Sequence, residues 1–307
     1  MDAAIIFPGQ ASQYVGMGRD LYETFPYVRE LFEKASHALE MDVADLCFNG
    51  PEERLRLTRY TQPSIFSVSI AAFQVLKREF QVNAVMSAGH SLGEYSALVC
   101  AGALEFEEAV RVLERRGAFM QEAVPPGDGA MAAIIGMSRE DVEGVCEKAG
   151  GTVEIANLNG AGQIVISGSA DPVRKAMQLI KKLGARRAVE LSVSAPFHSS
   201  LMGPAASRLS PLLKDLSLKR PLFPVVANLT GRPYPGEEEI PLSLERQIYS
   251  PVKWEETMEF FSQKRGVLIE AGPGKVLTGL ARRMLKGWKI ASFGSMDDVE
   301  KLEKVLN

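Results

Sequence analysis

Short apolar runs alternate along the chain with longer stretches whose apolar residues recur at helical spacing. Residues 3–7 and 82–88 are short, apolar runs that end at glycine-containing turns, which predicts two buried strands. Residues 27–39 carry apolar side chains with a period of three to four, and residues 63–78 and 104–121 are also predicted to be helices. Strands that alternate with helices in this way predict an α/β fold with a mostly parallel sheet.

The segment between residues 125 and 194 has a pattern of its own. It opens on the linker-like sequence Pro-Pro-Gly-Asp-Gly, and strands are expected at 130–135, 152–156, 163–167 and 187–193. Helices are expected after the capping residue Ser138 and over 171–183, which gives the order β-α-β-β-α-β of a ferredoxin-like unit. We therefore predict an α/β-hydrolase-like large domain with a parallel sheet, formed by residues 1–124 and 195–307. A ferredoxin-like small subdomain, residues 125–194, is inserted into it.

Composition narrows the class of protein. The chain has 307 residues, 46% of them hydrophobic, and a net charge of −3, so it can bury a large core and is not expected to bind nucleic acid. Its three cysteines are widely separated, which argues against a disulfide scaffold or a zinc site. The first residues show no secretory signal, and no apolar run approaches the ~20 residues of a membrane span. We expect a cytoplasmic monomer that binds no membrane and needs no metal.

Gly89-His90-Ser91-Leu92-Gly93 fits the pattern G-x-S-x-G and lies between a predicted strand and a predicted helix. A serine on such a sharp turn exposes its hydroxyl, and the two glycines let the backbone pass closely. The amides at the start of the following helix then point at the reaction centre. The pattern thus indicates a nucleophilic serine, although an ordinary glycine-rich turn gives the same five letters.

A serine nucleophile needs a base, and the chain has only three histidines. His37 lies opposite the apolar stripe of its helix and is expected to be solvated. His90 adjoins Ser91, and neighbouring side chains on a turn diverge. His198, in a predicted loop after a strand, is therefore the preferred base; the competing interpretation is a loop histidine without a role.

Arg116 lies within the apolar face of the helix predicted over 104–121. A buried guanidinium needs a partner, since an unpaired buried charge is costly. That partner is either a buried acidic side chain or the carboxylate of a ligand, and the pattern does not distinguish them.

Other functional interpretations of these motifs assign the catalytic role to different residues or to none. A patatin-type hydrolase would use Asp128 of Asp-Gly-Ala, which also fits a simple turn, and an α/β-hydrolase esterase would need Asp171 or Glu190 as its acid. A non-catalytic docking member of a synthase complex would form no adduct at Ser91. Residues 272–275, Gly-Pro-Gly-Lys, are expected to be a tight turn opening a helix at Val276, because they lack the rest of a phosphate-binding loop.

Taken together, five ordered motifs resemble the malonyl-CoA:acyl carrier protein transacylases of type II fatty acid synthesis over nearly the whole chain. They are F-P-G-Q-A-S-Q at residues 7–13, G-H-S-L-G-E-Y-S-A-L at 89–98, Arg116-Gly117 with Met120-Gln121, Q-I-Y-S-P-V at 247–252 and E-A-G-P-G at 270–274. Ala11 replaces a family glycine in the first motif.

The resemblance implies a ping-pong transfer of a malonyl group from malonyl-CoA to the phosphopantetheine thiol of acyl carrier protein, supplying fatty acid synthesis. Ser91 would be the nucleophile and His198 the base, held by a main-chain carbonyl near Gln247, and Arg116 would bind the malonyl carboxylate. The amides of Gln10 and Leu92 would form the oxyanion hole. Further substrate contacts are expected from a larger set: His90, Met120, Asn157, Asn159, Phe197 and Gln247.

The resemblance implies no permanently bound cofactor, with malonyl-CoA acting as substrate. Carrier proteins are acidic, so a basic docking surface is expected despite the negative net charge. Arg282, Arg283 and Lys286 cluster on the helix predicted after Gly274, which the resemblance places near the active-site entrance. A second basic cluster comprises Lys181, Lys182, Arg186 and Arg187 and is more typical of a solvated face.

Overall fold

A six-stranded sheet forms the centre of the larger part of the molecule. The computed structural model describes residues 1–193 and 195–306. The strand order is β10-β9-β1-β2-β7-β8, and all neighbours are parallel except β8, which is antiparallel to β7. The strands are β1 Asp2–Phe7, β2 Asn83–Gly89, β7 Val225–Ala227, β8 Arg232–Pro233, β9 Val267–Ala271 and β10 Lys289–Phe293. The predicted α/β class with a parallel-rich sheet is confirmed.

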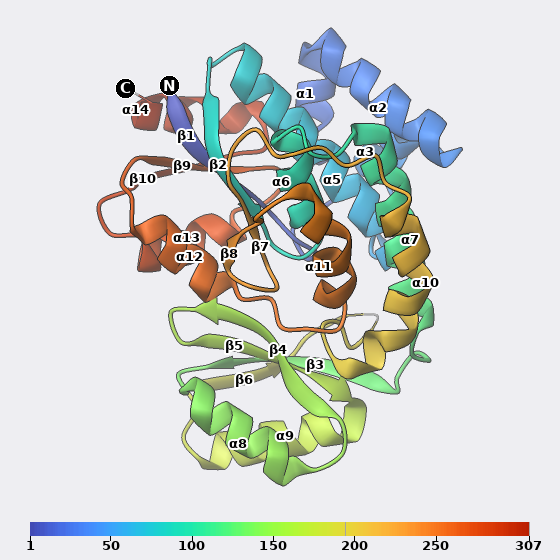
Figure 1. Ribbon diagram of the computed structural model, residues 1–307, viewed down its shortest axis with the longest axis vertical. Helices are drawn as coiled ribbons and strands as arrows, with labels where there is room; N and C mark the ends of the chain where they lie inside the picture. The colour runs from blue at the N-terminus through green and yellow to red at the C-terminus, as the bar shows by residue number, and fades with distance from the viewer. Residues whose placement is uncertain (194, 307) are drawn as a thin grey trace.

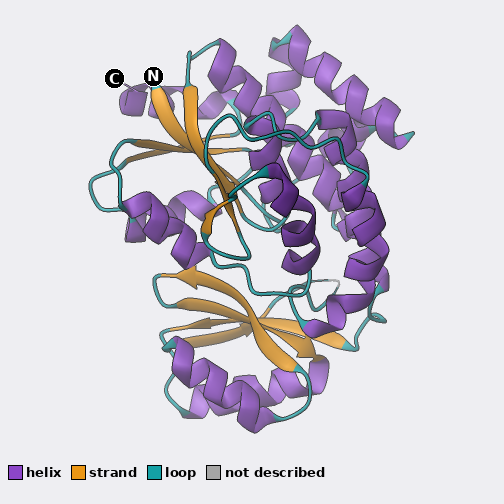
Figure 2. Cartoon of the chain, in the orientation of Figure 1, coloured by secondary structure: helices purple, strands orange, loops and turns teal. Residues whose placement is uncertain are grey.

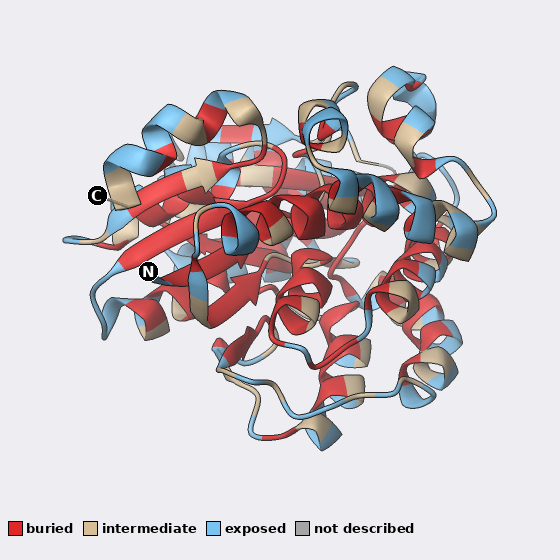
Figure 3. Cartoon of the chain, turned by 90° about the horizontal axis from the view of Figure 1, so that it is seen from above, coloured by how far each residue is buried: buried red, intermediate tan, exposed pale blue. Residues whose placement is uncertain are grey.

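Both faces of this sheet are covered by helices, which explains why the central strand β1 is apolar from Ala3 to Phe7. Along β1, Ile5 and Phe7 join the core formed with helix α5 (Thr58–Arg78), where Phe7 meets Phe73 edge to face. The alternate residues Ala4 and Ile6 pack on the opposite face, against α12 (Trp254–Ser262) and α13 (Val276–Met284). Because successive strand residues point to opposite faces, burial on both sides makes β1 apolar from Ala3 to Phe7. Figure 3 shows the buried strands enclosed by helices whose outer surfaces are exposed.

The remaining helices of the large part surround the same sheet (Figure 1). They are α1 Arg19–Thr24, α2 Pro26–Leu39, α3 Val43–Asn49, α4 Glu52–Leu55, α6 Gly93–Cys100, α7 Phe106–Glu122, α10 Gly203–Lys214, α11 Ile240–Gln247 and α14 Val299–Leu306. Helix α5 begins five residues before the predicted start and contains Pro63 in its interior. The prediction placed the proline in the first turn, where it is favoured. Instead the buried Thr61 hydroxyl donates to the carbonyls of Leu55 and Leu57, and the earlier turn stays helical.

A second, antiparallel sheet lies beside the first, with α8 (Arg139–Ala149) and α9 (Ala170–Lys182) on its outer face (Figures 1 and 2). Its strands are β3 Gly129–Ile135, β4 Val153–Gly160, β5 Gln163–Ser169 and β6 Arg187–Glu190, in the order β4-β5-β3-β6. The predicted succession of strands and helices is present, and Ser138 caps α8 through a 3.1 Å bond from the Asp141 amide. Strand β6 ends three residues before the predicted end, because the chain turns where the Val193 amide donates to Leu191.

Strand β4 links the second sheet to the larger part of the molecule. The Leu158 amide donates to the Val252 carbonyl, and the Val252 amide donates to Ala156, both at 2.9 Å. This places β4 next to the loop that leads into α12. Ser194 and Asn307, where predicted domain boundaries fall, lie outside the described residues. Among the helices described, none is long and apolar enough to cross a membrane.

Candidate active site

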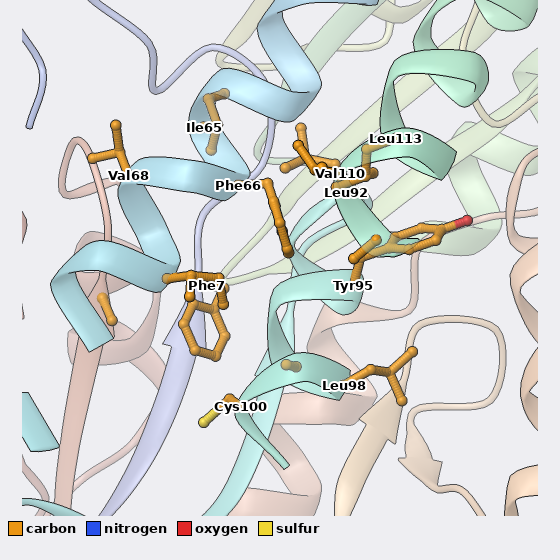
Figure 4. Packing of buried hydrophobic residues seen from close by; sticks show 14 of the residues in the cluster. Phe7, Ile65, Phe66, Val68, Leu92, Tyr95, Leu98, Cys100, Val110 and Leu113 are labelled. Carbon is orange, nitrogen blue, oxygen red and sulfur yellow. The ribbon is translucent and has the colours of Figure 1, made fainter. Parts of the chain in front are cut away.

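Ser91 occupies a strained turn between strand β2 and helix α6. Its φ is +54°, in the left-handed region that side chains rarely adopt. A Cβ atom at Gly89 would lie 1.9 Å from the Gly93 backbone, and one at Gly93 would lie 2.4 Å from the Phe7 carbonyl oxygen. Both glycines are therefore required by close packing. Figure 4 shows Leu92 and Tyr95, which follow the serine, packed among side chains of the buried core.

The turn is held in place by Asn228, which follows the neighbouring strand β7. Its Oδ1 accepts a 2.7 Å hydrogen bond from the Ser91 amide, and its Nδ2 donates to the Gly89 carbonyl at 2.7 Å. The side chain thus bridges both sides of the serine. The sequence alone does not predict this role of Asn228, because nothing near it in the chain marks it as a partner of a residue 137 positions away.

Ser91 and His198 form a hydrogen-bonded pair. The His198 Nε2 lies 2.8 Å from the Ser91 Oγ, and its Nδ1 lies 2.8 Å from the main-chain oxygen of Gln247. A carbonyl oxygen only accepts, so Nδ1 carries the proton and Nε2 is free to accept from the serine hydroxyl. The histidine itself adopts a φ of +58° and is almost fully buried.

The electrostatic surroundings keep this histidine neutral. Burial, reinforced by the positive charge of Arg116, lowers the pKa of His198 to about 3. The hydrogen bond to the Gln247 carbonyl opposes that shift but is outweighed. At neutral pH the imidazole is therefore unprotonated and competent to take a proton.

The structure places the other two histidines elsewhere. His37 is exposed on α2, and the His90 Nε2 lies 3.0 Å from the Asn159 Oδ1, directed away from the serine hydroxyl. The acids required by the hydrolase readings are also remote: Asp128 is exposed, and Glu190 pairs with Arg174. The Asp171 side chain is 99% exposed. The place of a third catalytic acid is taken by a main-chain carbonyl.

Arg116 is buried, with 1% of its surface exposed. Its hydrogen bonds show which residues are its partners. Nη1 donates to the Gln62 Oε1 at 2.8 Å, and Nη2 donates to the Gln247 Oε1 at 2.8 Å and to the Ser91 Oγ at 3.0 Å. No ion pair involves this guanidinium within residues 1–193 and 195–306. The interpretation in which a buried acidic side chain forms a direct salt bridge with Arg116 is therefore wrong. Gln62 was missed, although a glutamine inside an apolar helix is itself a signal.

These side chains open onto a cavity of about 130 Å³. The lining includes Gln10, His90, Ser91, Leu92, Arg116, Met120, Asn157, Phe197 and His198 from the predicted site, together with Gln62, Ala11, Met131, Leu191 and Val193. Gln247 and Asn159 do not line this cavity, but they hydrogen-bond to Arg116 and His90, which do. A second hollow of about 310 Å³ shares Gln10, Ala11 and Val193 with the first and extends towards Tyr14 and Arg56.

The loop after strand β1 meets the nucleophile turn. Strands β1 and β2 are parallel neighbours, so the loops after them meet: the His90 amide donates to Phe7, and Gly9 packs on the His90 carbonyl. In the described part of the chain, the amides of Gln10 and Leu92 donate to no protein acceptor. The Leu92 amide also precedes the first turn of α6, where the helix dipole favours negative charge.

The comparisons with known proteins agree with this geometry. The family model described as "Acyl transferase domain" matches residues 4–303. The chain belongs to the acyl transferase family. It is 46% identical over 286 residues to the malonyl CoA-acyl carrier protein transacylase of Escherichia coli (strain K12), covering 92% of each chain. It is 44% identical over 301 residues to that of Bacillus subtilis (strain 168), covering 97% of this chain and 95% of the relative.

Solved structures of acyl transferases share the whole fold. The malonyl CoA-acyl carrier protein transacylase from Coxiella burnetii superposes with a TM-score of 0.95 at 41% identity, covering 100% of this chain and 98% of the other. A malonyl-transacylase solved in complex with its type II PKS acyl-carrier protein gives a TM-score of 0.95 at 43% identity, covering 99% and 100%.

In this acyl transferase the two basic clusters are exposed. Arg282 and Arg283 directly precede Met284, whose methyl group would meet a Cβ atom at Gly160, the last residue of β4. The start of α13 at Val276 was predicted, and the buried Glu270 carboxylate accepts from the amides of Leu277 and Thr278. Within the residues described, no group of acidic, histidine or cysteine side chains is arranged to hold a metal ion.

Proposed function

We propose that this chain transfers a malonyl group from malonyl-CoA to the phosphopantetheine thiol of acyl carrier protein, supplying fatty acid synthesis. The observation that carries the proposal is the position of the Ser91 Oγ between a neutral imidazole and a buried guanidinium, 2.8 Å from His198 and 3.0 Å from Arg116. The names of the relatives support malonyl-CoA and acyl carrier protein as the two substrates.

In the first half-reaction, the Ser91 hydroxyl gives its proton to the His198 Nε2 as its Oγ attacks the thioester carbon. The amides of Gln10 and Leu92 stabilise the oxygen that becomes negative. The carbon–sulfur bond then breaks, and coenzyme A leaves with the proton from His198. The product is a malonyl ester on Ser91.

The second half-reaction runs through the same groups in reverse. The phosphopantetheine thiol gives its proton to His198 and attacks the ester carbon. The bond to the Ser91 Oγ breaks, and the serine recovers a proton from His198. Coenzyme A leaves before the carrier-protein thiol reacts with the malonyl ester, so the kinetics are ping-pong, and one base serves both half-reactions.

Arg116 would bind the free carboxylate of the malonyl group. Its Nη2 already contacts the Oγ that carries the acyl chain, so a carboxylate at the far end of a malonyl ester lies within reach. Phe197, which lines the cavity, would leave little room for the α-methyl branch of methylmalonyl-CoA. His90, Asn157, Asn159 and Met120 would contact or support the acyl and pantetheine groups.

The domain division is part of the same proposal. Residues 1–124 and 195–307 would form the α/β-hydrolase-like domain, which the strand-turn-helix around Ser91 supports. Residues 125–194 would form a ferredoxin-like subdomain, supported by the order β4-β5-β3-β6 with two helices on one face. We expect the protein to act as a cytoplasmic monomer without a permanently bound cofactor.

The carrier protein would dock on Arg282, Arg283 and Lys286. Helix α13, which bears Arg282 and Arg283, packs at the end of β4, the strand that brings Asn157 to the cavity. The basic surface therefore lies next to an element of the site and would attract an acidic partner.

Intact-mass measurement after incubation with malonyl-, methylmalonyl- and acetyl-CoA tests the function. We expect a malonyl adduct on the wild type, little or none from methylmalonyl-CoA, and no adduct on Ser91→Ala. Replacing His198 by alanine should slow acylation and transfer together, by about 10²–10⁴-fold. A stable adduct on Ser91→Ala would refute the assignment, and an unlabelled wild type would favour a non-catalytic docking role.

A further inference from the structure

A fully buried carboxylate, Glu94, lies three residues after the nucleophile in the first turn of α6. It accepts hydrogen bonds from the Tyr234 hydroxyl, from the Gln247 Nε2 at 2.7 Å and from the Asn228 amide at 3.1 Å. No ion pair neutralises it among the residues described. The catalytic steps above do not use this group. Burying a carboxylate is costly even when it is hydrogen-bonded, so its position beside the nucleophile turn calls for an explanation.

Gln247 links Glu94 to Arg116, Ser91 and His198. Its Oε1 accepts from Arg116, its Nε2 donates to the Ser91 carbonyl at 3.0 Å, and its main-chain oxygen accepts from His198. In its ionised form Glu94 only accepts hydrogen bonds, so it then requires the Nε2 of Gln247 to face it. The amide oxygen is thereby directed at Arg116. A flipped amide would place two acceptors together and present its NH₂ group to the guanidinium.

Asn228 links Glu94 to the other side of the nucleophile turn. Its backbone amide donates to Glu94, while its side chain bonds the Ser91 amide and the Gly89 carbonyl. One carboxylate thus orders two side chains from distant segments, each in direct contact with the serine turn.

We propose that Glu94 is a positioning residue that orients Gln247 and Asn228, and through them sets Arg116 and His198 relative to Ser91. This inference rests on the proposed function, because it assigns Glu94 to the selection of a malonyl group by Arg116. Without Glu94 the Gln247 Nε2 keeps only the Ser91 carbonyl as its acceptor, and the Gln247 Oε1 that accepts from the Arg116 Nη2 is held less firmly. Malonyl transfer should then suffer more than acetyl transfer, since only the malonyl group needs the guanidinium.

The test compares single-turnover rates of Ser91 labelling by malonyl-CoA and acetyl-CoA, followed by intact mass. Glu94→Ala should lower the malonyl-to-acetyl rate ratio by about tenfold, as expected when a charge-assisted contact is misaligned. Glu94→Gln should recover the ratio to within about threefold, because an amide oxygen still accepts from Gln247 and Asn228 while its NH₂ group faces Tyr234. A merely structural role would reduce the amount of folded protein but would leave the ratio unchanged.

Glu270→Ala is the matched control. Glu270 is also a fully buried carboxylate that accepts two backbone amides, but its partners belong to α13. Its loss should lower Tm and leave the ratio unchanged. If Glu94→Ala does not fold, Tyr234→Phe removes one donor to Glu94 and should lower the ratio by about threefold.

The inference is overturned if Glu94→Ala, or Tyr234→Phe in its place, keeps the wild-type ratio while Arg116→Ala loses it. An unlabelled wild type would instead refute the proposed function, and this inference with it. The two failures are therefore distinguishable in one set of measurements.

Discussion

The Nη2 of Arg116 lies 3.0 Å from the Oγ of Ser91, although 25 residues separate them along the chain. The guanidinium belongs to α7 and the hydroxyl to the turn before α6, so the packing of two helices brings a cation to the nucleophile. The same hydroxyl donates to the uncharged His198. A single oxygen therefore meets both the base and the group proposed to select the acyl chain.

Replacing Arg116 by alanine should exchange malonyl for acetyl preference. A charge-assisted contact contributes roughly 1.5–3 kcal/mol, so the malonyl-to-acetyl ratio should fall at least about tenfold. The measurement is the rate of transfer from each thioester to carrier protein. Arg115→Ala, an exposed arginine on the same helix, is the control and should keep the ratio. Equal losses with both thioesters would make Arg116 a structural residue.

Protonation of His198 should cause no loss of acylation rate near the ordinary histidine pKa of about 6.5. Burial and the charge of Arg116 lower the pKa of His198 to about 3, so the free enzyme holds the active, neutral imidazole down to that range. Titration of His198 should therefore lower the rate only as the pH falls towards about 3. Burial raises the pKa of Glu94 to about 7. The profile should be repeated in Glu94→Gln, where any inflection near 7 should disappear. A protonation step near 6.5 that survives in Glu94→Gln would contradict the lowered pKa of His198.

Ala11→Gly should relieve backbone strain in the loop that carries Gln10. The φ of Ala11 is +77°, which costs a residue with a Cβ atom about 1–2 kcal/mol and costs glycine little. Glycine also gains freedom in the unfolded chain, so we expect a net increase of up to about 1 kcal/mol in the free energy of unfolding. Ala11→Ser keeps the Cβ atom and should show no gain. Urea denaturation measures the free energy of unfolding of both variants. Equal free energies of unfolding for the two would argue against strain at this position.

Arg282→Glu combined with Arg283→Glu should raise the KM for carrier protein several-fold, because both exposed charges would then repel an acidic partner. The rate of Ser91 acylation by malonyl-CoA should change much less. The difference should fade with added salt, since exposed charges are screened within about 10 Å at 0.1 M ionic strength. Lys181→Glu with Lys182→Glu, on α9, is the matched control. If the first variant had the wild-type KM for carrier protein at low salt, the docking surface would lie elsewhere.

The local pattern of the chain was sufficient to predict the turn at Ser91, the burial of Arg116 and the alternation of strands and helices. Each of these depends on residues a few positions apart: glycines beside the serine, apolar neighbours one helical turn away, and runs bounded by turns. The choice of His198 also needed no structure, because two of only three histidines could be set aside on local grounds. The predicted ends of helices and strands were less accurate where tertiary contacts override local sequence preference, as at the start of α5 and the end of β6.

Only the tertiary structure decided which groups meet. The partners of Arg116 are two glutamines and a serine from α5, α11 and the β2–α6 turn, and the partner of the His198 Nδ1 is a main-chain oxygen, which no side-chain pattern can reveal. Asn228 and Tyr234 reach Ser91 and Glu94 across 137 and 140 residues because β7 pairs with β2. Periodicity reports whether a side chain is buried, whereas hydrogen-bond partners depend on strand order, and strand order is a property of the folded chain as a whole.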